Sequence, residues 1–346
     1  MDGLLVTHLP DVRYLSGFTG SNAALVLAGG RAVLFTDGRY TAQAKQEARG
    51  LRVVIAKKAA AIAASEWLAA AKVRRCGFDA GRTTVLEMKA MQKAIKIMPA
   101  KRRRGFFTAV GPLVAELRWV KDSDEIRKMR RAAALGCRLF EGVLKKIVPG
   151  VTEASVAAAM EFGARMGGAE AMSFETIVAS AKRSAMPHGK ASGAKLPGRG
   201  FVTLDFGVVL DGYCSDMTRT VHLGNALPRE REVYDSVLEA QLNAVAAVRP
   251  GVTAGEVDEA ARKVLRRAGL ARYFSHSTGH GVGLEIHEGP RVAAKQKQVL
   301  QPGMVITIEP GAYLPGTFGV RIEDMVLVTA RGAEVLTPST KAWIEL

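Results

Sequence analysis

Two aspartates occupy positions where neighbouring strands would bring their carboxylates together. Residues 201–209 alternate as a strand does, and residues 210–213 are typical of a two-residue hairpin turn. If residues 210 and 213 pair, Asp205 lies opposite residue 218, and Asp216 is its diagonal neighbour on the same face. Such carboxylates repel each other and lose hydration, so we expect a cation between them. The alternative is that both are ordinary hydrogen-bonded residues of the sheet and its turn.

A second pair of acids favours metal binding over that alternative. Glu309 ends one predicted strand, and Glu323 lies inside the apolar alternation of another. His280 has a glycine on each side, which lets the backbone approach an ion or ligand closely. On its own, His280 would more often be a structural histidine. Together, four acids and one imidazole form a ligand set that suits Mn²⁺, Co²⁺ or Zn²⁺, and carboxylates can bridge two such ions.

A faint internal repeat places these residues in two similar half-domains. Residues 149–152 (PGVT) recur as residues 250–253, and each copy precedes an amphipathic helix that ends in glycine. A histidine segment and then a strand-rich stretch with two acids follow each helix. The first half contains His188, Asp205 and Asp216, and the second contains His280, Glu309 and Glu323. This order predicts a site on a pseudo-twofold axis between the halves.

The first third of the chain has the pattern of a separate α/β domain. Its apolar segments 23–27 and 32–35 flank a glycine turn and predict a β-hairpin. We interpret residues 101–112, which begin with a basic run, as a crossing between domains. A length of 346 residues also favours two domains. We therefore expect an α/β (α+β) protein with an N-terminal domain over 1–115 and a second domain over 116–346.

The formal net charge of +16 comes mainly from the first third. Residues 1–120 contain 20 Lys and Arg against 8 Asp and Glu, whereas the remaining residues contain 29 against 25. Such an asymmetry can indicate nucleic acid or an acidic partner. No aromatic interleaving or nucleic-acid motif accompanies the charge, so a solvated basic surface is the simpler interpretation, and nucleic acid is not an expected partner.

Composition and cysteine usage set the class of protein. With 48% apolar and 24% charged residues, the chain has ordinary globular composition. No apolar run approaches the ~20 residues of a membrane helix, and the N-terminus lacks the pattern of a secretory signal. The three cysteines are scattered and odd in number, which argues against a disulfide framework. We expect a cytoplasmic protein without a membrane partner.

Residues 276–288 (HSTGHGVGLEIHE) resemble the signature of the proline-specific metallopeptidases of the pita-bread fold. Further blocks of that family resemble residues 14–21, 36–40, 204–207, 213–220, 302–311 and 320–324. The family includes Xaa-Pro dipeptidase (prolidase) and aminopeptidase P, with creatinase and methionine aminopeptidase as relatives. The resemblance implies a creatinase-type N-terminal domain followed by a pita-bread catalytic domain with pseudo-twofold symmetry. The five metal-ligand positions of the family match Asp205, Asp216, His280, Glu309 and Glu323.

The resemblance also implies a reaction, the hydrolysis of the Xaa-Pro peptide bond at a dinuclear centre. Two divalent ions, Mn²⁺ by expectation with Co²⁺ or Zn²⁺ as alternatives, would lower the pKa of a shared water. The resulting hydroxide would attack the carbonyl carbon that precedes the proline nitrogen. His188 and His287 match histidines that contact substrate and intermediate, although a plain loop histidine is the alternative for His188. Glu309 matches the residue that carries a proton to the leaving nitrogen.

Three further residues receive supporting roles. His276 would shape the substrate pocket or support the ligands from behind. Arg321 shares a strand face with Glu323 and would orient a ligating carboxylate, with a surface salt bridge as the alternative. Arg291 matches an arginine associated with the carboxylate of a C-terminal proline, and its planar guanidinium suits that task. The alternative for Arg291 is an exposed loop arginine.

Competing functions remain at this point. We favour an Xaa-Pro dipeptidase, with aminopeptidase P, which accepts longer peptides, as the runner-up. Two alternatives are more remote. One is a pita-bread enzyme with other chemistry, and the other is a non-catalytic protein that binds nucleic acid through its basic first third. The filled ligand set argues against the non-catalytic protein and against creatinase, and the extra N-terminal domain argues against methionine aminopeptidase. By resemblance and because twofold oligomers are commonest, we expect a homodimer.

Overall fold

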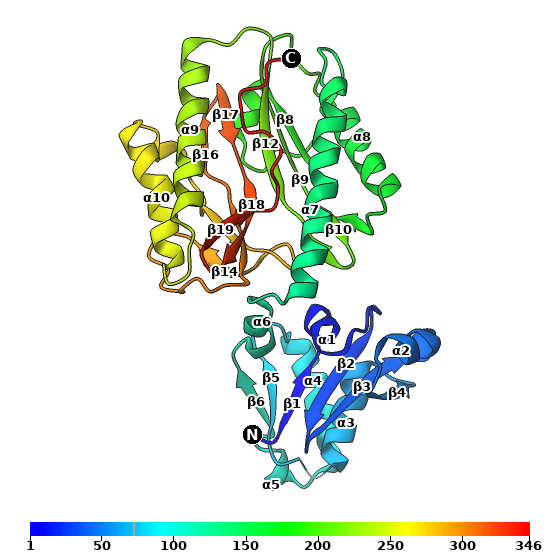
Figure 1. The fold of residues 1–346 in the computed structure, drawn as a ribbon. Helices are drawn as coiled ribbons and strands as arrows, with labels where there is room; N and C mark the ends of the chain where they lie inside the picture. Colours follow the sequence, from blue (N-terminus) through cyan, green and yellow to red (C-terminus); the bar gives the residue numbers. More distant parts are fainter. Residues whose placement is uncertain (72) are drawn as a thin grey trace. The chain divides into compact units, whose positions relative to one another are not determined.

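The computed structural model describes residues 1–71 and 73–346. The described chain divides into two compact units, Met1–Arg118 and Trp119–Leu346. This division lies close to the boundary expected after residue 115. Each unit has its own sheets, helices and hydrophobic core (Figure 1).

The N-terminal unit is built on one six-stranded sheet in the order β4-β3-β2-β1-β5-β6. Its strands are β1 Gly3–Val6, β2 Ala23–Ala28, β3 Arg31–Asp37, β4 Arg52–Ala56, β5 Cys76–Asp79 and β6 Phe107–Val110. Its helices are α1 Leu9–Ser16, α2 Thr41–Glu47, α3 Ala60–Ala70, α4 Val85–Ala94, α5 Ala100–Arg103 and α6 Leu113–Arg118. The predicted hairpin is confirmed, because β2 and β3 pair in antiparallel fashion from Ala23 opposite Thr36 to Ala28 opposite Arg31.

The interpretation of residues 101–112 as a crossing between domains is wrong. They contain helix α5 and strand β6, and β6 pairs in parallel with β5, with Phe107 opposite Cys76. Phe106, beside this strand, is buried in the core with residues of α3 and α4. A four-residue edge strand is too short to show a periodic pattern, and the preceding basic run hid it.

The second unit contains strands from both halves of the predicted repeat. Its strands are β7 Ala171–Met172, β8 Ile177–Ser180, β9 Gly200–Phe206, β10 Val208–Leu210, β11 Tyr213–Cys214, β12 Met217–Leu223, β13 Gly279–Gly281, β14 Glu288–Val292, β15 Val305–Ile308, β16 Gly311–Leu314, β17 Phe318–Arg321, β18 Asp324–Thr329 and β19 Gly332–Val335. They form sheets in the orders β12-β9-β8, β11-β10-β7, β14-β13-β15-β18-β19 and β16-β17.

Four long helices flank these strands (Figure 1). They are α7 Ser123–Val143, α8 Glu153–Met166, α9 Pro228–Ala247 and α10 Ala254–Arg267. Short 3₁₀ helices complete the chain: η1 Gly38–Tyr40, η2 Ile95–Ile97, η3 Leu144–Lys146, η4 Ala181–Ala185 and η5 Ala271–Tyr273. Helices α7 and α8 share one hydrophobic core with the β9–β12 sheet, and α9 and α10 share another with β15 and β18.

The sequence repeat corresponds to a repeated local structure. Thr152 and Thr253, the last residues of the two PGVT copies, are the N-caps of α8 and α10. The side-chain oxygen of each accepts a hydrogen bond from the backbone N–H three residues later. Gly150 and Gly251 have φ angles of +89° and +87°, a conformation that favours glycine. The two predicted half-domains are therefore confirmed.

The predicted hairpin register is also confirmed, although the hairpin is not continuous. Leu210 pairs with Tyr213, and Asp205 lies opposite Thr218. The ladder is interrupted between β9 and β10 at Gly207, where an added Cβ would lie 1.8 Å from the carbonyl oxygen of Ser215. At this close approach the β12-β9-β8 sheet ends and the β11-β10-β7 sheet begins. Asp216 lies in the interruption between β11 and β12.

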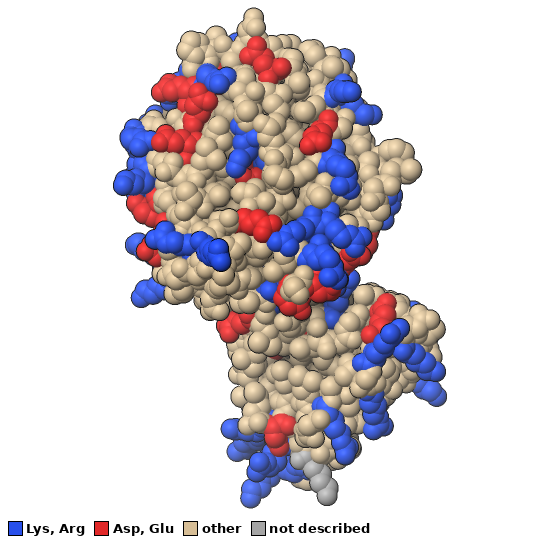
Figure 2. All heavy atoms as spheres, in the orientation of Figure 1, with Lys and Arg blue, Asp and Glu red and all other residues tan. Residues whose placement is uncertain are grey.

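The charge asymmetry of the sequence is visible on the N-terminal unit. Exposed basic residues gather around α5, namely Lys101, Arg102 and Arg104, with Lys96 on the preceding turn (Figure 2). Among the described residues, no helix has both the length and the hydropathy that crossing a bilayer requires.

Candidate metal centre

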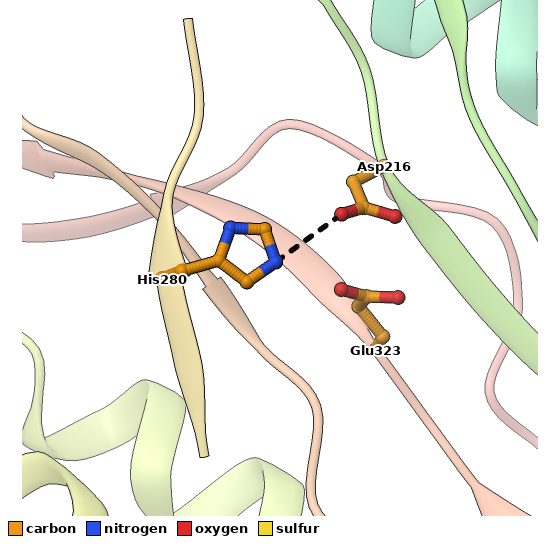
Figure 3. Close-up of side chains that lie close together, drawn as sticks. All are labelled: Asp216, His280 and Glu323. Carbon is orange, nitrogen blue, oxygen red and sulfur yellow. Dashed lines mark ion pairs between the residues drawn. The ribbon is translucent and has the colours of Figure 1, made fainter. Parts of the chain in front are cut away.

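Three side chains in the second unit converge on one point. One ligand atom from each of Asp216, His280 and Glu323 lies within 4.8 Å of the others (Figure 3). Asp216 precedes β12, His280 is the middle residue of β13, and Glu323 lies between β17 and β18. Two of the three come from the second half of the repeat and one from the first, so the cluster lies between the two half-domains as the sequence predicted.

The carboxylates of this cluster repel each other in the absence of a cation. Asp216 and Glu323 are 4% and 2% exposed. Burial, followed by the negative charges of Glu323, Asp205 and Glu309, raises the pKa of Asp216 well above its usual value. Burial and the charges of Glu309 and Asp205 raise the pKa of Glu323 in the same way. The ionised carboxylates therefore give the site an excess of negative charge, which a divalent cation would neutralise.

His280 presents a lone pair, rather than a proton, to these carboxylates. Its Nδ1 lies 3.0 Å from the carbonyl oxygen of Gly281, which can only accept, so Nδ1 carries the proton. Burial lowers the pKa of His280 to about 4, so the ring is neutral at pH 7. Nε2 lies 3.6 Å from both Asp216 Oδ2 and Glu309 Oε1. Three electron-pair donors that face one another at this spacing fit a metal ion.

Asp205 and Glu309 stand beside the cluster and are held differently. Asp205 Oδ2 accepts a 2.6 Å hydrogen bond from Arg321, while its buried Oδ1 has no hydrogen-bond partner within residues 1–71 and 73–346. Burial raises the pKa of Glu309 to about 8, although Arg321 opposes this shift. The unpaired oxygen of Asp205 is the second observation that fits a bound cation, because buried polar atoms rarely lack a partner.

Arg321 connects several of these groups from behind. It is 3% exposed, and it donates to Thr218 Oγ1 at 3.1 Å and to Tyr313 Oη at 2.7 Å, besides Asp205. Thr218 in turn donates to Glu323 Oε2 at 2.7 Å. The prediction that Arg321 orients a carboxylate thus agrees with this geometry, and the alternative of a surface salt bridge is wrong.

Thr218 and Tyr313 were missed by the sequence reasoning. The signal for Thr218 was present, because the predicted register already placed residue 218 opposite Asp205. Tyr313 has no such signal, because its hydroxyl meets Arg321 of β17 and the distant His276 only in the packed fold.

His276 lies beside the centre with both ring nitrogens engaged. Its Nδ1 donates to the carbonyl oxygen of Ser277 at 2.8 Å, and its Nε2 accepts from the Tyr313 hydroxyl at 2.8 Å. Burial lowers the pKa of His276 to about 4, so it is neutral at pH 7. Both nitrogens are thus engaged by protein groups, and the ring forms part of the cavity wall.

A cavity of about 570 Å³ opens over the centre. Its apolar wall includes Phe174, Ile177, Pro187 and Ile286. All ten predicted site residues also line it: His188, Asp205, Asp216, His276, His280, His287, Arg291, Glu309, Arg321 and Glu323. Among these predicted residues, the exposed ones are His188, His287 and Arg291, which lie at the mouth of the cavity. The ring of His287 lies 4.5 Å from that of His280, edge to face. The structure thus brings together every residue that the sequence singled out.

The chain matches two family models. Residues 127–330 match metallopeptidase family M24, and residues 1–120 match the creatinase/prolidase N-terminal domain. These matches confirm the predicted fold, a creatinase-type N-terminal domain followed by a pita-bread catalytic domain.

Individual relatives cover nearly the whole chain. An Xaa-Pro dipeptidase of Pyrococcus horikoshii is 36% identical over 344 residues, which are 99% of this chain and 95% of the relative. The structure of an Xaa-Pro dipeptidase from Bacillus anthracis has a TM-score of 0.95 at 40% identity, and the match covers 100% of this chain and 95% of that one. The structure of an X-Pro aminopeptidase from Thermotoga maritima has a TM-score of 0.90 at 34% identity, with 100% and 98% covered.

Proposed function

We propose that this chain, which belongs to metallopeptidase family M24, hydrolyses Xaa-Pro dipeptides at a centre that binds two divalent ions. The observation that carries the metal centre is the neutral His280, whose lone pair faces two carboxylates across 3.6 Å. The proposed ligands are Asp205, Asp216, His280, Glu309 and Glu323. Two relatives similar over nearly the full length are named Xaa-Pro dipeptidases, which supports this substrate class.

The bound ions would supply a water of near-neutral pKa and a Lewis acid for the substrate carbonyl. Mn²⁺ is the metal we propose, because oxygen-rich sites with one imidazole suit it. The protein supplies proton transfer and positioning. Glu309 accepts the proton of the attacking water and donates it to the proline nitrogen as the peptide bond breaks. His188 and His287, at the mouth of the cavity, donate hydrogen bonds to the substrate.

Arg291 is the proposed determinant of dipeptide length. It lines the cavity with an exposed side chain, on strand β14 close to His287. A guanidinium can form two parallel hydrogen bonds with the carboxylate of a C-terminal proline. A dipeptide presents that carboxylate, whereas a longer peptide has an amide in its place. Recognition by Arg291 therefore favours dipeptides.

The first experiment compares substrates and metals. Ala-Pro, Ala-Pro-amide, Ala-Pro-Ala-Ala and Met-Ala-Ser are assayed with chelator-treated protein and after addition of Mn²⁺, Co²⁺ or Zn²⁺. We expect no turnover without metal, the highest kcat/KM for Ala-Pro, and none for Met-Ala-Ser. Equal kcat/KM for Ala-Pro and Ala-Pro-Ala-Ala would instead support aminopeptidase P, the second candidate, which the likeness to the Thermotoga maritima enzyme favours.

The second experiment tests Arg291 directly. Arg291→Ala should raise KM for Ala-Pro about ten- to a hundredfold, the equivalent of a charged hydrogen bond of about 1.5–3 kcal/mol. The KM for Ala-Pro-amide should hardly change. Arg331→Ala is the matched control, because Arg331 is an exposed arginine of the same unit outside the cavity lining. An equal rise in KM for both substrates would remove Arg291 from this role.

The proposed assembly is a homodimer. A dipeptide-sized site needs walls that exclude water and longer chains, and a second subunit is the simplest source of such a wall. Light scattering at micromolar concentration should then give about twice the chain mass of 36.9 kDa. A mass equal to a single chain would contradict this assembly.

A further inference from the structure

A carboxylate at the start of α8, outside the cavity, holds the segment that carries His188. Glu153 is the first residue of α8, and its exposure is 0%. One oxygen, Oε1, accepts from the backbone N–H of Ser180 at 2.8 Å and from its hydroxyl at 2.9 Å. The other, Oε2, accepts from the N–H and hydroxyl of Ser192 at 3.2 and 2.7 Å. Arg183 Nε lies 3.0 Å from Oε2 and 3.2 Å from Oε1.

These partners lie on both sides of His188. Ser180 ends strand β8, and Arg183 belongs to η4, so both precede His188. Ser192 follows it and is also fixed by its carbonyl, which accepts from the backbone N–H of Ala154. One carboxylate thus joins the entry and the exit of residues 180–192. Within the segment, Arg183 donates to the carbonyl oxygen of Lys190 at 2.6 Å.

Helix capping does not explain this arrangement. In α10, the second copy of the repeat, Glu256 at the third helical position forms a capping box with Thr253. In α8 the third position is Ser155, and the acid stands at the first position instead. The side chain of Glu153 bonds to residues 27 and 39 positions away rather than to its own helix terminus. The acid therefore organises the segment, while the positive end of the helix dipole stabilises its charge.

The second half-domain has a comparable arrangement. Asp258 of α10 is 1% exposed and accepts from the hydroxyl of Thr278 at 2.7 Å and from Arg262 Nε at 2.7 Å. Arg262 in turn donates to the carbonyl oxygen of His276 at 2.6 Å. Both halves thus place a buried helical acid, paired with an arginine, behind a segment that carries a site histidine.

We propose that Glu153 is a positioning residue for the reaction, which fixes His188 over the cavity by joining both ends of residues 180–192. This inference rests on the proposed function, because it assumes that His188 acts on the substrate. Glu153 reaches no residue of the metal cluster with its side chain. Its loss should therefore lower kcat through His188 and leave the bound metal unchanged.

The test uses Glu153→Gln in the full-length, metal-loaded protein. Glutamine has nearly the size of glutamate, but its amide nitrogen cannot accept the hydrogen bonds that one carboxylate oxygen accepts in the wild type. The substitution therefore breaks part of the network. We expect kcat for Ala-Pro to fall about ten- to a hundredfold, the range for partners that orient active groups, at unchanged metal content. Glu161→Gln on the exposed face of the same helix is the matched control and should keep wild-type kcat.

A double mutant separates positioning from general stability. If Glu153 acts through His188, Glu153→Gln should cause no further loss of kcat in a His188→Gln background. Equal losses in both backgrounds, or a loss of metal in the single variant, would overturn the proposal. If Glu153→Gln does not fold, Ser192→Ala removes one hydroxyl donor and should give a smaller kcat loss with the same dependence on His188.

Hydrogen exchange provides a readout that is independent of activity. The backbone N–H groups of Met186 and Gly189 are bonded within the segment, to Arg183 and Met186. Their exchange should accelerate in Glu153→Gln, while the amides in the middle of α8 exchange as in the wild type. Unchanged exchange in residues 181–191 would refute the proposal. Failure of the wild type to hydrolyse any Xaa-Pro peptide, with accelerated exchange in the variant, would instead refute the proposed function.

Discussion

The two half-domains hold their histidines in opposite ways. His280 lies in the middle of strand β13, inside a five-stranded sheet, with its Nδ1 fixed by the backbone. His188 lies in an exposed turn outside any strand and is held through its neighbours. A metal ligand must be placed within a few tenths of an ångström, which a sheet interior provides. A residue that contacts substrate has to admit and release it, which suits a turn fixed at its ends.

The largest expected effect concerns the metal ligands, which need the more exact placement. Asp216→Asn should lower turnover at least about a hundredfold and reduce the bound metal, because an amide cannot supply the ligating charge. Metal content by mass spectrometry and kcat for Ala-Pro measure both effects. The chelator-treated variant should be at least as stable as the chelator-treated wild type, since it removes a carboxylate from a repulsive cluster. More than a few per cent of wild-type turnover in metal-replete buffer would contradict the assignment.

Metal removal should make stability depend on pH in a defined direction. Burial raises the pKa of Glu309 from 4.5 to about 8, so the folded metal-free protein holds a proton that the unfolded chain releases. Its stabilising contribution is complete below pH 4.5 and is lost as the pH rises through about 8. The thermal midpoint of the second unit in chelator should therefore fall between pH 5 and pH 8. Glu309→Gln should flatten this slope, and a midpoint that rises with pH would be the opposite result.

The next prediction separates the two histidines. His188→Gln should lower kcat about a hundredfold, which is the lower end of the range for loss of a side chain that hydrogen-bonds the reacting groups. The metal content should stay at the wild-type level. His280→Gln should lower both. If both variants lost metal equally, the proposed division between a metal-binding His280 and a substrate-binding His188 would be wrong.

The two buried acids behind the histidines offer a finer comparison. Asp258 bonds to Thr278, whose carbonyl oxygen accepts from the backbone N–H of Glu309 at 2.8 Å. Asp258→Asn should therefore weaken metal affinity about tenfold, whereas Glu153→Gln should leave it unchanged. Titration of the metal-free proteins with Mn²⁺ measures this difference. Glu259→Gln, the exposed neighbour on α10, is the control and should bind metal as the wild type does.

The sequence was sufficient for features that local rules determine. A turn with Asp211 and Gly212, at φ angles of +52° and +78°, set the register that brings Asp205 opposite Thr218. The PGVT copies marked both helix starts, because a threonine cap is a local signal. The site residues themselves were found through their motifs rather than through any derivation of distance.

The remainder depends on contacts between distant segments. The glycines beside His280 were interpreted as leaving room for an ion, but they leave room for neighbouring strands. A Cβ at Gly279 would lie 1.9 Å from the carbonyl oxygen of Thr307, and one at Gly281 would lie 2.0 Å from that of Gly289. No spacing rule connects Glu153 with Ser192 or Arg321 with Tyr313. Such pairs follow from the packed fold and cannot be obtained from periodicity.

The smallest expected effect concerns the backbone next to the Glu153 network. Ala181 follows Ser180 directly and has a φ angle of +47°, a left-handed conformation that costs an L-residue about 1–2 kcal/mol. Ala181→Gly removes this cost but gives the unfolded chain extra freedom worth roughly 0.5–1 kcal/mol. The net result should be a gain of at most about 1.5 kcal/mol, which calorimetry would detect as a rise of up to roughly 6 °C in Tm.

Two comparisons show whether this small effect depends on the φ angle of Ala181 and on the Glu153 network. Ala185→Gly, at the end of the same 3₁₀ helix, should lower Tm, because its φ angle is not positive and glycine gains nothing there. In a Glu153→Gln background the benefit of Ala181→Gly should shrink, since a released segment lets Ala181 leave the left-handed region. If the benefit stayed the same in both backgrounds, the conformation of Ala181 would be set by the end of β8 alone. The segment that carries His188 would then owe its order to a sheet, as His280 does.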